Sequence, residues 1–188
     1  VNAALVGDPS DVRSWRVLDP LAPHARAVPT HADAAGIAHP TARLMSQLGV
    51  FLDSKALHAD AEPLMRRALA IDEASFGTDH PNVARDLNNL AALLKATNRL
   101  SDAEPLMRRG IGILLEFGRR TGHQHPNLDA GLGNYVALLA DMGKSEKEIQ
   151  ATIMEALASG GASARRDLRL GSIGQAPRGN TGRGIGRI

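Results

Sequence analysis

Few residues of this chain have types and spacing that suggest chemistry, and the clearest resemble part of a phosphate-binding loop. Gly143-Lys144-Ser145 has the Gly-Lys-Ser order of that loop, in which the lysine and backbone N–H groups hold phosphates. The full motif also needs a glycine five positions before Gly143, where this chain has Leu138, and a preceding strand, where residues 132–139 have a helical pattern. We therefore interpret the segment as a turn and a helix N-cap, and we predict no nucleotide site.

Metal binding and nucleophilic catalysis find little support. Of the seven histidines, His123 and His125 are the closest pair, but no carboxylate stands at a fixed helical spacing from them. The chain has no cysteine, which excludes thiolate catalysis, disulfides and sulfur-containing zinc sites. His80 and His125 each precede a proline that can begin a helix, which is a structural role. No nucleophile elbow is present, and Asp72-Glu73 fits a solvated helix face, so we predict no enzyme, no metal and no cofactor.

Composition narrows the remaining classes of protein. The chain has 188 residues, of which 43% are hydrophobic and 22% charged, as expected for a folded domain of ordinary size. Residues 161–188 hold six arginines and one aspartate, a net charge of +5, so residues 1–160 carry +2 − 5 = −3 and only the tail is basic. No apolar run approaches the roughly 20 residues of a membrane helix, and no secretion signal is visible, so we expect a cytoplasmic protein without membrane contact.

An internal repeat is the most informative feature of the sequence. The seven residues of Ala61–Arg67, AEPLMRR, return unchanged at Ala103–Arg109, 42 positions later. His-Pro pairs begin at His39, His80 and His125, with offsets of 41 and 45. A period of this length predicts stacked copies of one supersecondary unit.

Each unit has the pattern of two helices joined by a turn. The apolar residues of the middle unit recur with helical spacing at Leu87, Leu90, Ala91 and Leu94. Asn98-Arg99 interrupts this pattern, and Ser101 with Glu104 predicts a capping box at the start of a second helix. Ser145 with Glu148 repeats that signal in the third unit. We predict three helix pairs, at about 41–75, 82–118 and 127–158.

In these units the sequence resembles the tetratricopeptide repeat family, in its kinesin-light-chain type. Small residues recur where the paired helices would approach closely, at Gly49/Ala91, Ala61/Ala103 and Ala68/Gly110. The sequences of Leu87–Leu93 and of Ala103–Leu106 are similar to the kinesin-light-chain unit, and the resemblance covers about residues 40–160. It implies an all-α, right-handed tetratricopeptide superhelix, an α-α solenoid of three helix pairs, whose first helices line a concave groove that binds proteins.

The segment before the repeats gives a second resemblance. Asp8-Pro9, Trp15 and Leu21–Ala25 are similar to the linker that precedes such repeats in bacterial signal-transducing ATPases of the NB-ARC/STAND-like kind. That likeness implies that the chain is a carboxy-terminal piece of a larger switch. The expected domains are an N-terminal helical linker or cap at 1–38, the tetratricopeptide repeats at 39–160 and a disordered Gly/Arg-rich tail at 161–188.

The candidate partner-binding residues are polar side chains of the first helices. They are Arg43, Ser46, Gln47, Arg85, Asn88, Asn89 and Asn134. Amides both donate and accept hydrogen bonds, so they can pair with the backbone of an extended peptide, and arginine can hold a carboxylate or phosphate. The structural alternative is that these are ordinary surface residues. For Arg66-Arg67 and Arg108-Arg109 we favour a solvated outer face, paired with Glu62 and Glu104 at i,i+4.

The predicted function is a protein-interaction module that binds a peptide or protein partner in the concave groove. The alternative is a C-terminal sensor fragment of a signal-transducing ATPase with no independent activity. A third class, RNA binding through the tail, has weak support, because the tail lacks aromatic residues and has only scattered Arg-Gly steps. Three repeats are near the minimum for a stable stack, so weak self-association through an uncapped end is a further hypothesis.

Overall fold

The computed structural model describes residues 9–21 and 38–159, and the regular secondary structure of those residues is helical. Three short elements come first: η1 (Val12–Ser14), α1 (Trp15–Leu18) and η2 (Asp19–Leu21). Six longer helices follow as three pairs: α3 (Ala38–Ser54) with α4 (His58–Phe76), α5 (Pro81–Ala96) with α6 (Leu100–Thr121), and α7 (Leu128–Asp141) with α8 (Glu146–Ser159).

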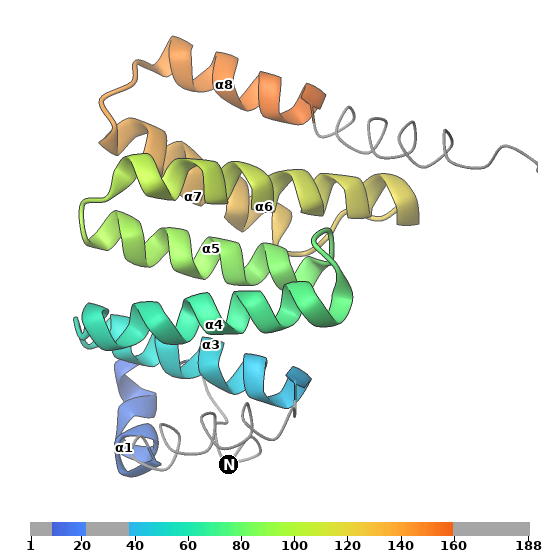
Figure 1. The fold of residues 1–188 in the computed structure, drawn as a ribbon. Coiled ribbons are helices and arrows are strands. Elements are labelled where there is room, and N and C mark those ends of the chain that lie inside the picture. The colour runs from blue at the N-terminus through green and yellow to red at the C-terminus, as the bar shows by residue number, and fades with distance from the viewer. Residues whose placement is uncertain (1–8, 22–37, 160–188) are drawn as a thin grey trace, which may run out of the picture.

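The pairs stack on one another to form an α-α solenoid (Figure 1). In the view of Figure 1, α4 and α6 form the near layer, and α3, α5 and α7 lie behind them. Helix α5 packs on α6 within its pair and on α4 of the preceding pair, and α7 packs on α6 in the same manner. The prediction of an all-α solenoid of three helix pairs is confirmed.

One large core runs along the stack because each first helix presents an apolar stripe to its neighbours, and a small second cluster lies between α3 and α4. In α5 the helical spacing of the sequence buries Leu87, Leu90 and Leu94 almost completely, and in α7 it buries Tyr135 and Leu139. Burial of each such side chain stabilises the fold by about 1.5–3 kcal/mol. These contacts pack each first helix on the second helices beside it.

The two helices of every pair are joined by the same turn. The backbone N–H groups of Leu57, Arg99 and Lys144 donate to the carbonyls of Leu52, Leu94 and Leu139, at 2.9, 2.8 and 3.1 Å. These are the six-to-one hydrogen bonds of a Schellman motif, which needs a left-handed residue just before the donor. Ala56, Asn98 and Gly143 hold that position, with φ of 60°, 58° and 79°.

Ala56 is the unfavourable residue among the three, so Ala56→Gly is expected to stabilise the protein. A left-handed conformation costs an L-residue with a Cβ about 1–2 kcal/mol, whereas glycine adopts it freely. We expect the free energy of unfolding to rise by about 1 kcal/mol, measured by urea unfolding followed by circular dichroism. The matched control is Ala70→Gly, at an exposed position inside α4, which should lose about 1 kcal/mol. Equal losses in both variants would contradict the left-handed turn.

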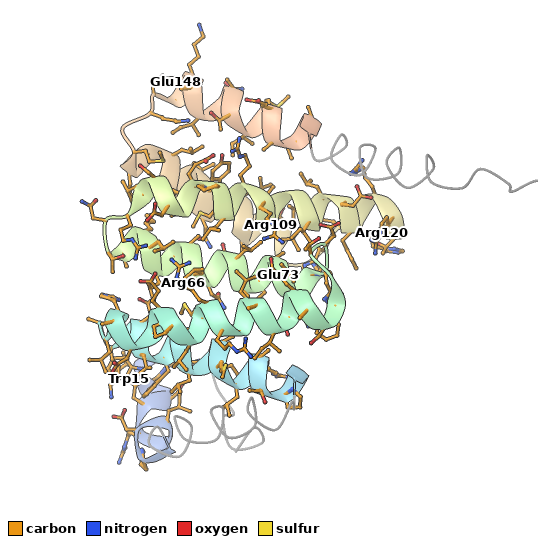
Figure 2. The ribbon with its side chains drawn as sticks, viewed as in Figure 1. Trp15, Arg66, Glu73, Arg109, Arg120 and Glu148 are labelled. Atoms are coloured by element: carbon orange, nitrogen blue, oxygen red, sulfur yellow. The ribbon has the colours of Figure 1, made fainter. Side chains whose placement is uncertain are left out.

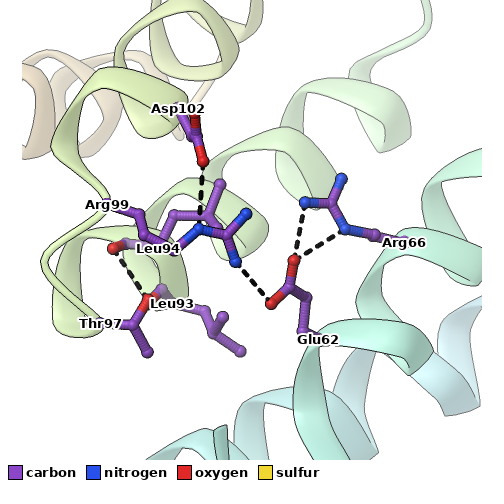
Figure 3. Close-up of polar contacts among 7 residues, drawn as sticks. All are labelled: Glu62, Arg66, Leu93, Leu94, Thr97, Arg99 and Asp102. Carbon is purple, nitrogen blue, oxygen red and sulfur yellow. Dashed lines mark hydrogen bonds and ion pairs between the residues drawn. The ribbon is translucent and has the colours of Figure 1, made fainter. Parts of the chain in front are cut away.

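The start of α6 differs from the sequence prediction. The predicted capping box of Ser101 and Glu104 is wrong: α6 begins at Leu100, and Ser101 already lies inside it. The Schellman turn fixes this earlier start, and the Arg99 side chain crosses the first turn to bond the Asp102 carboxylate, with Nε and Oδ2 3.1 Å apart (Figure 3). The corresponding prediction for α8 is confirmed in one half, because the Ser145 N–H donates to the Glu148 carboxylate at 2.8 Å.

The N-terminal segment covers the open end of the first pair. Leu18 is buried in the shared core, and Trp15 meets Phe51 of α3 edge to face, with ring centroids 6.5 Å apart (Figures 1 and 2). The Lys55 amine lies 5.1 Å from the centroids of both rings and pairs with Asp19. The rest of the predicted cap, at 22–37, and the predicted disordered tail, at 161–188, lie outside the described residues.

Candidate functional site

The predicted partner-binding residues all lie on the first helices, α3, α5 and α7, but they differ in exposure. Arg43 and Asn134 are exposed, and Gln47, Arg85, Asn88 and Asn89 are partly buried. Ser46 is only 4% exposed. The structure therefore gives Ser46 an interior position, although the sequence pattern predicted a surface one.

Three of these residues meet in one polar network between the first and second pairs. The Ser46 hydroxyl donates to Asp86 Oδ1 at 2.9 Å, and the Asn89 amide donates to the Ser46 hydroxyl at 3.3 Å. The Arg85 guanidinium bonds the same Asp86 oxygen, through Nε at 3.2 Å and Nη2 at 3.1 Å. Arg85 Nη2 also reaches Asp72 Oδ2 of α4, at 3.4 Å. Arg85 thus links α5 to α4.

Asp72 corrects an expectation from the sequence. The pair Asp72-Glu73 fitted a solvated helix face, but the structure leaves Asp72 fully buried. The signal was present in the spacing: Ala61, Met65 and Ala68 form the buried stripe of α4, and Asp72 continues it four residues after Ala68. Glu73, in contrast, lies on the outside and pairs with Arg109.

The network holds more negative charge than positive charge. The carboxylates of Asp72 and Asp86 share one guanidinium, and burial is the main reason why the pKa of Asp86 rises to about 6. Arg85 and the Ser46 hydroxyl oppose this rise in pKa, and the neighbouring Asp72 adds to it. Asp72 Oδ1 and Asp86 Oδ2 have no hydrogen-bond partner among the described residues. Arg85 therefore compensates two buried acids incompletely.

A second polar contact joins the second and third pairs. The Asn134 amide of α7 donates to the Asn88 carbonyl oxygen of α5 at 3.1 Å. Asn88 of α5 and Asn134 of α7 are thus brought together. This contact leaves the amide N–H groups of Asn88 to serve other acceptors.

A pocket of about 150 Å³ lies beside these residues, between α5, α6 and the beginning of α7. Its polar lining includes Arg85, Asn88 and Asn89, three of the predicted residues. Its apolar lining comes from α6, with Met107, Ile111 and Leu114. Gly131 of α7 also lines it, and a Cβ added there would lie 3.9 Å from Ile111 and Leu114.

The arginine pairs of the second helices have a structural role. Arg66 pairs with Glu62 at 2.7 Å (Figure 3). Arg108 pairs with Glu104 at 3.6 Å, and both pairs are at i,i+4, which confirms the outer-face interpretation. Glu62 also binds Arg99 at 2.8 Å, which connects the first pair to the second (Figure 3). Arg109 of α6 reaches Glu73 of α4 at 2.7 Å (Figure 2).

His80 begins a helix as predicted, because it is the N-cap of α5 and Pro81 is the first residue of that helix. The same prediction for His125 is wrong, because a turn at residues 126–127 follows it and α7 begins only at Leu128. The Nδ1 atoms of His80 and His125 each accept the backbone N–H two residues later, at 3.2 Å. The His80 ring stacks on Phe76 with centroids 4.5 Å apart, and the His125 ring meets Phe117 edge to face at 5.1 Å. Across residues 9–21 and 38–159 there is no group of three or more potential metal ligands.

The comparisons with known proteins agree with this geometry. Residues 40–116 match the tetratricopeptide repeat family. The match runs from α3 into α6, so this segment is similar to tetratricopeptide repeats. Repeats of this family mediate protein–protein interaction.

Among solved structures, the tetratricopeptide fold is similar to the crystal structure of BtubC (BKLC) from P. vanneervenii, with a TM-score of 0.61 and 18% sequence identity. That match covers 93% of this chain and 66% of BtubC, so the chain spans a little under two thirds of that protein. No curated protein matches the chain. None of the described helices is both long and apolar enough to cross a membrane.

Proposed function

We propose that this chain binds an extended peptide or protein segment in the groove formed by α3, α5 and α7. The observation that carries the proposal is the pocket between α5, α6 and the start of α7, because its polar lining consists of Arg85, Asn88 and Asn89 of α5 and Asn127 just before α7. A rim of amides beside an apolar floor suits a peptide, which offers backbone donors and acceptors at regular intervals and side chains between them. No step of this function is catalytic.

The proposed mechanism is capture by a preorganised surface. Asn89 is held by Ser46, and Asn88 by Asn134, at 3.3 and 3.1 Å, so their amides are oriented before a ligand arrives. The groove residues then lose little conformational entropy on binding, and most of the ordering cost falls on the peptide. Each hydrogen bond to the peptide backbone contributes about 0.5–1.5 kcal/mol.

The test is to select binders for the intact protein from a phage-displayed library of random 12-residue peptides. The best peptide is then measured by fluorescence anisotropy against Asn89→Ala/Asn134→Ala. We expect affinity to fall about tenfold, because about two hydrogen bonds are lost or misoriented, while helical content stays unchanged. Arg108→Ala on the outer face is the matched control and should bind as the parent does. Unchanged affinity in the groove variant would refute the groove assignment.

The alternative is that these residues are the sensor end of a signal-transducing ATPase. It is supported by the packing of Trp15 and Leu18 on the first pair, because a domain upstream of that segment would be coupled directly to the solenoid. Its test is the intact mass of the native polypeptide, captured with an antibody against the repeats. A species several times larger than 19.9 kDa supports the alternative, and a species of 19.9 kDa supports a free-standing adaptor.

Self-association remains a separate proposal. On α8, at the far end of the stack, Met154 is 62% exposed and Leu157 is 40% exposed. These side chains supply an apolar surface at the end of the solenoid, where a polar cap is usual.

A further inference from the structure

We infer that the groove pocket selects a peptide with an uncharged aliphatic side chain, of leucine, isoleucine or methionine size, and discriminates against acidic neighbours of that residue. For brevity, the pocket lined by Arg85, Asn88, Asn89, Met107, Ile111 and Leu114 is called the anchor pocket. The inference rests on the proposed groove function and adds the chemical class of its ligand.

The shape of the anchor pocket fits an aliphatic side chain. Its volume is about 150 Å³, and its floor is made by Met107, Ile111 and Leu114. An aliphatic cavity of about this size binds an apolar group as large as benzene. The polar lining is formed by Arg85, Asn88 and Asn89 of α5 and by Asn127 just before α7, so an apolar side chain can reach the floor while the peptide backbone stays at these polar groups.

The charge around the anchor pocket argues against an acidic ligand. Arg85 is the one cation in the pocket lining, and its guanidinium already bonds Asp72 and Asp86. With both carboxylates ionised, these three side chains carry a net charge of −1. A ligand carboxylate would therefore meet a neutralised arginine and an excess buried negative charge, and like charges placed together cost binding energy.

The other cation among the predicted groove residues does not change this balance. Arg43 lies on α3, in the preceding pair, and is not part of the pocket lining. The charged side chains of the pocket lining and its direct polar contacts are Arg85, Asp72 and Asp86.

The phage selection described above, carried out at pH 7.5, tests this ligand class through the sequences that it enriches. We expect one aliphatic position in the consensus and fewer Asp and Glu residues beside it than in the unselected library. A synthetic peptide with the aliphatic residue changed to alanine should bind at least tenfold more weakly, and one with an added neighbouring aspartate should also lose affinity. Asp86→Asn, which removes one of the two acids that hold Arg85, should recover binding of the aspartate peptide.

Two glycines of α7 offer matched variants. Gly131→Leu places its side chain toward Ile111 and Leu114 and fills the anchor pocket, whereas an added Cβ at Gly133 meets no atom within 4 Å. Both changes replace a helical glycine by the same good helix former, so their intrinsic effects on α7 are equal. We expect Gly131→Leu to reduce affinity for the selected peptide at least tenfold and Gly133→Leu to leave it unchanged, with circular dichroism verifying the fold.

The outcomes separate the inference from the proposed function. Enriched peptides that are acidic, or that bind Gly131→Leu as tightly as the parent protein, would overturn the anchor pocket. If such peptides still bind Asn89→Ala/Asn134→Ala more weakly than the parent, the proposal of groove binding stands. Failure to enrich any peptide from the library would overturn both. Aliphatic peptides that lose affinity in Gly131→Leu but not in Gly133→Leu support the anchor pocket.

Discussion

Arg85→Met is expected to lower the free energy of unfolding by about 2–3 kcal/mol at pH 7.5. Loss of one partner from a buried charge pair costs about 3–5 kcal/mol, and Arg85 is expected to fall below that range because its side chain is 34% exposed and water screens part of its charge. The variant leaves Asp72 and Asp86 without the guanidinium that both contact. Methionine keeps the apolar stem, so the change reports on the charge and its hydrogen bonds rather than on packing.

The effect of Arg85→Met should shrink as the pH is lowered. The folded pKa of Asp86, about 6, lies above its ordinary value of 3.8, so the folded state binds this proton more tightly than the unfolded state does. The contribution of Asp86 to stability is therefore greatest below about pH 4 and is lost as the pH rises through 6. Without Arg85, which lowers that pKa, the loss with rising pH becomes larger.

Urea unfolding at pH 5 and pH 7.5 checks this prediction. The control is Arg85→Met/Asp86→Asn, which lacks the titrating carboxyl. The change in its free energy of unfolding between pH 5 and pH 7.5 should approach the change measured for Asp86→Asn alone. The comparison between variants cancels the contributions that histidines and other groups titrating in the same pH range make to the free energy of unfolding. A loss in Arg85→Met that is equal at both pH values would show that Asp86 is not the group that Arg85 stabilises.

Gly110→Leu is expected to destabilise the protein by about 3 kcal/mol, the upper end of ordinary overpacking. A Cβ added at Gly110 would lie 3.3 Å from the carbonyl oxygen of Ala84 and 3.7 Å from the Leu87 side chain. The first of these neighbours is backbone, so relief requires α5 and α6 to move apart. Thermal unfolding followed by circular dichroism measures the effect.

Gly112→Leu is the matched control, two residues further along the same helix. A Cβ at Gly112 meets no atom within 4 Å, so the variant should gain about 0.5–1 kcal/mol from replacing glycine inside a helix. Opposite signs for the two variants support a close approach of α5 and α6 at Gly110. Destabilisation of similar size in both would assign the effect to α6 in general.

Most of the repeat architecture could be predicted from local patterns. The apolar spacing of α5 depends on residues close in sequence, and it determines which face of the helix is buried. The return of AEPLMRR after 42 residues is visible by comparing the sequence with itself, and it predicts the repeat. Details of helix ends were less predictable. Ser101 and Glu104 have the spacing of a capping box, but the Schellman turn through Asn98 starts α6 at Leu100, before that box could act.

The candidate groove was predicted in its residue types but not in its electrostatics. The sequence pattern placed Arg85 and Asn89 on the first helices, and in the structure they line the pocket. The pattern could not show that Asp72, thirteen positions before Arg85, would be buried against it, because that contact needs α4 and α5 of different pairs to pack together. Ser46 was likewise predicted at the surface, but the adjacent helix α5 covers it.

The sequence alone determined the helical class, the repeat period and the role of His80 at the start of α5, because each follows from local sequence patterns. Only the tertiary structure decided that Arg85 is neutralised by two buried aspartates and that Gly131 borders an apolar pocket. Those properties depend on which faces of neighbouring pairs meet, and hence on contacts between residues that are distant in the chain. The ligand class inferred for the groove comes from that second kind of information.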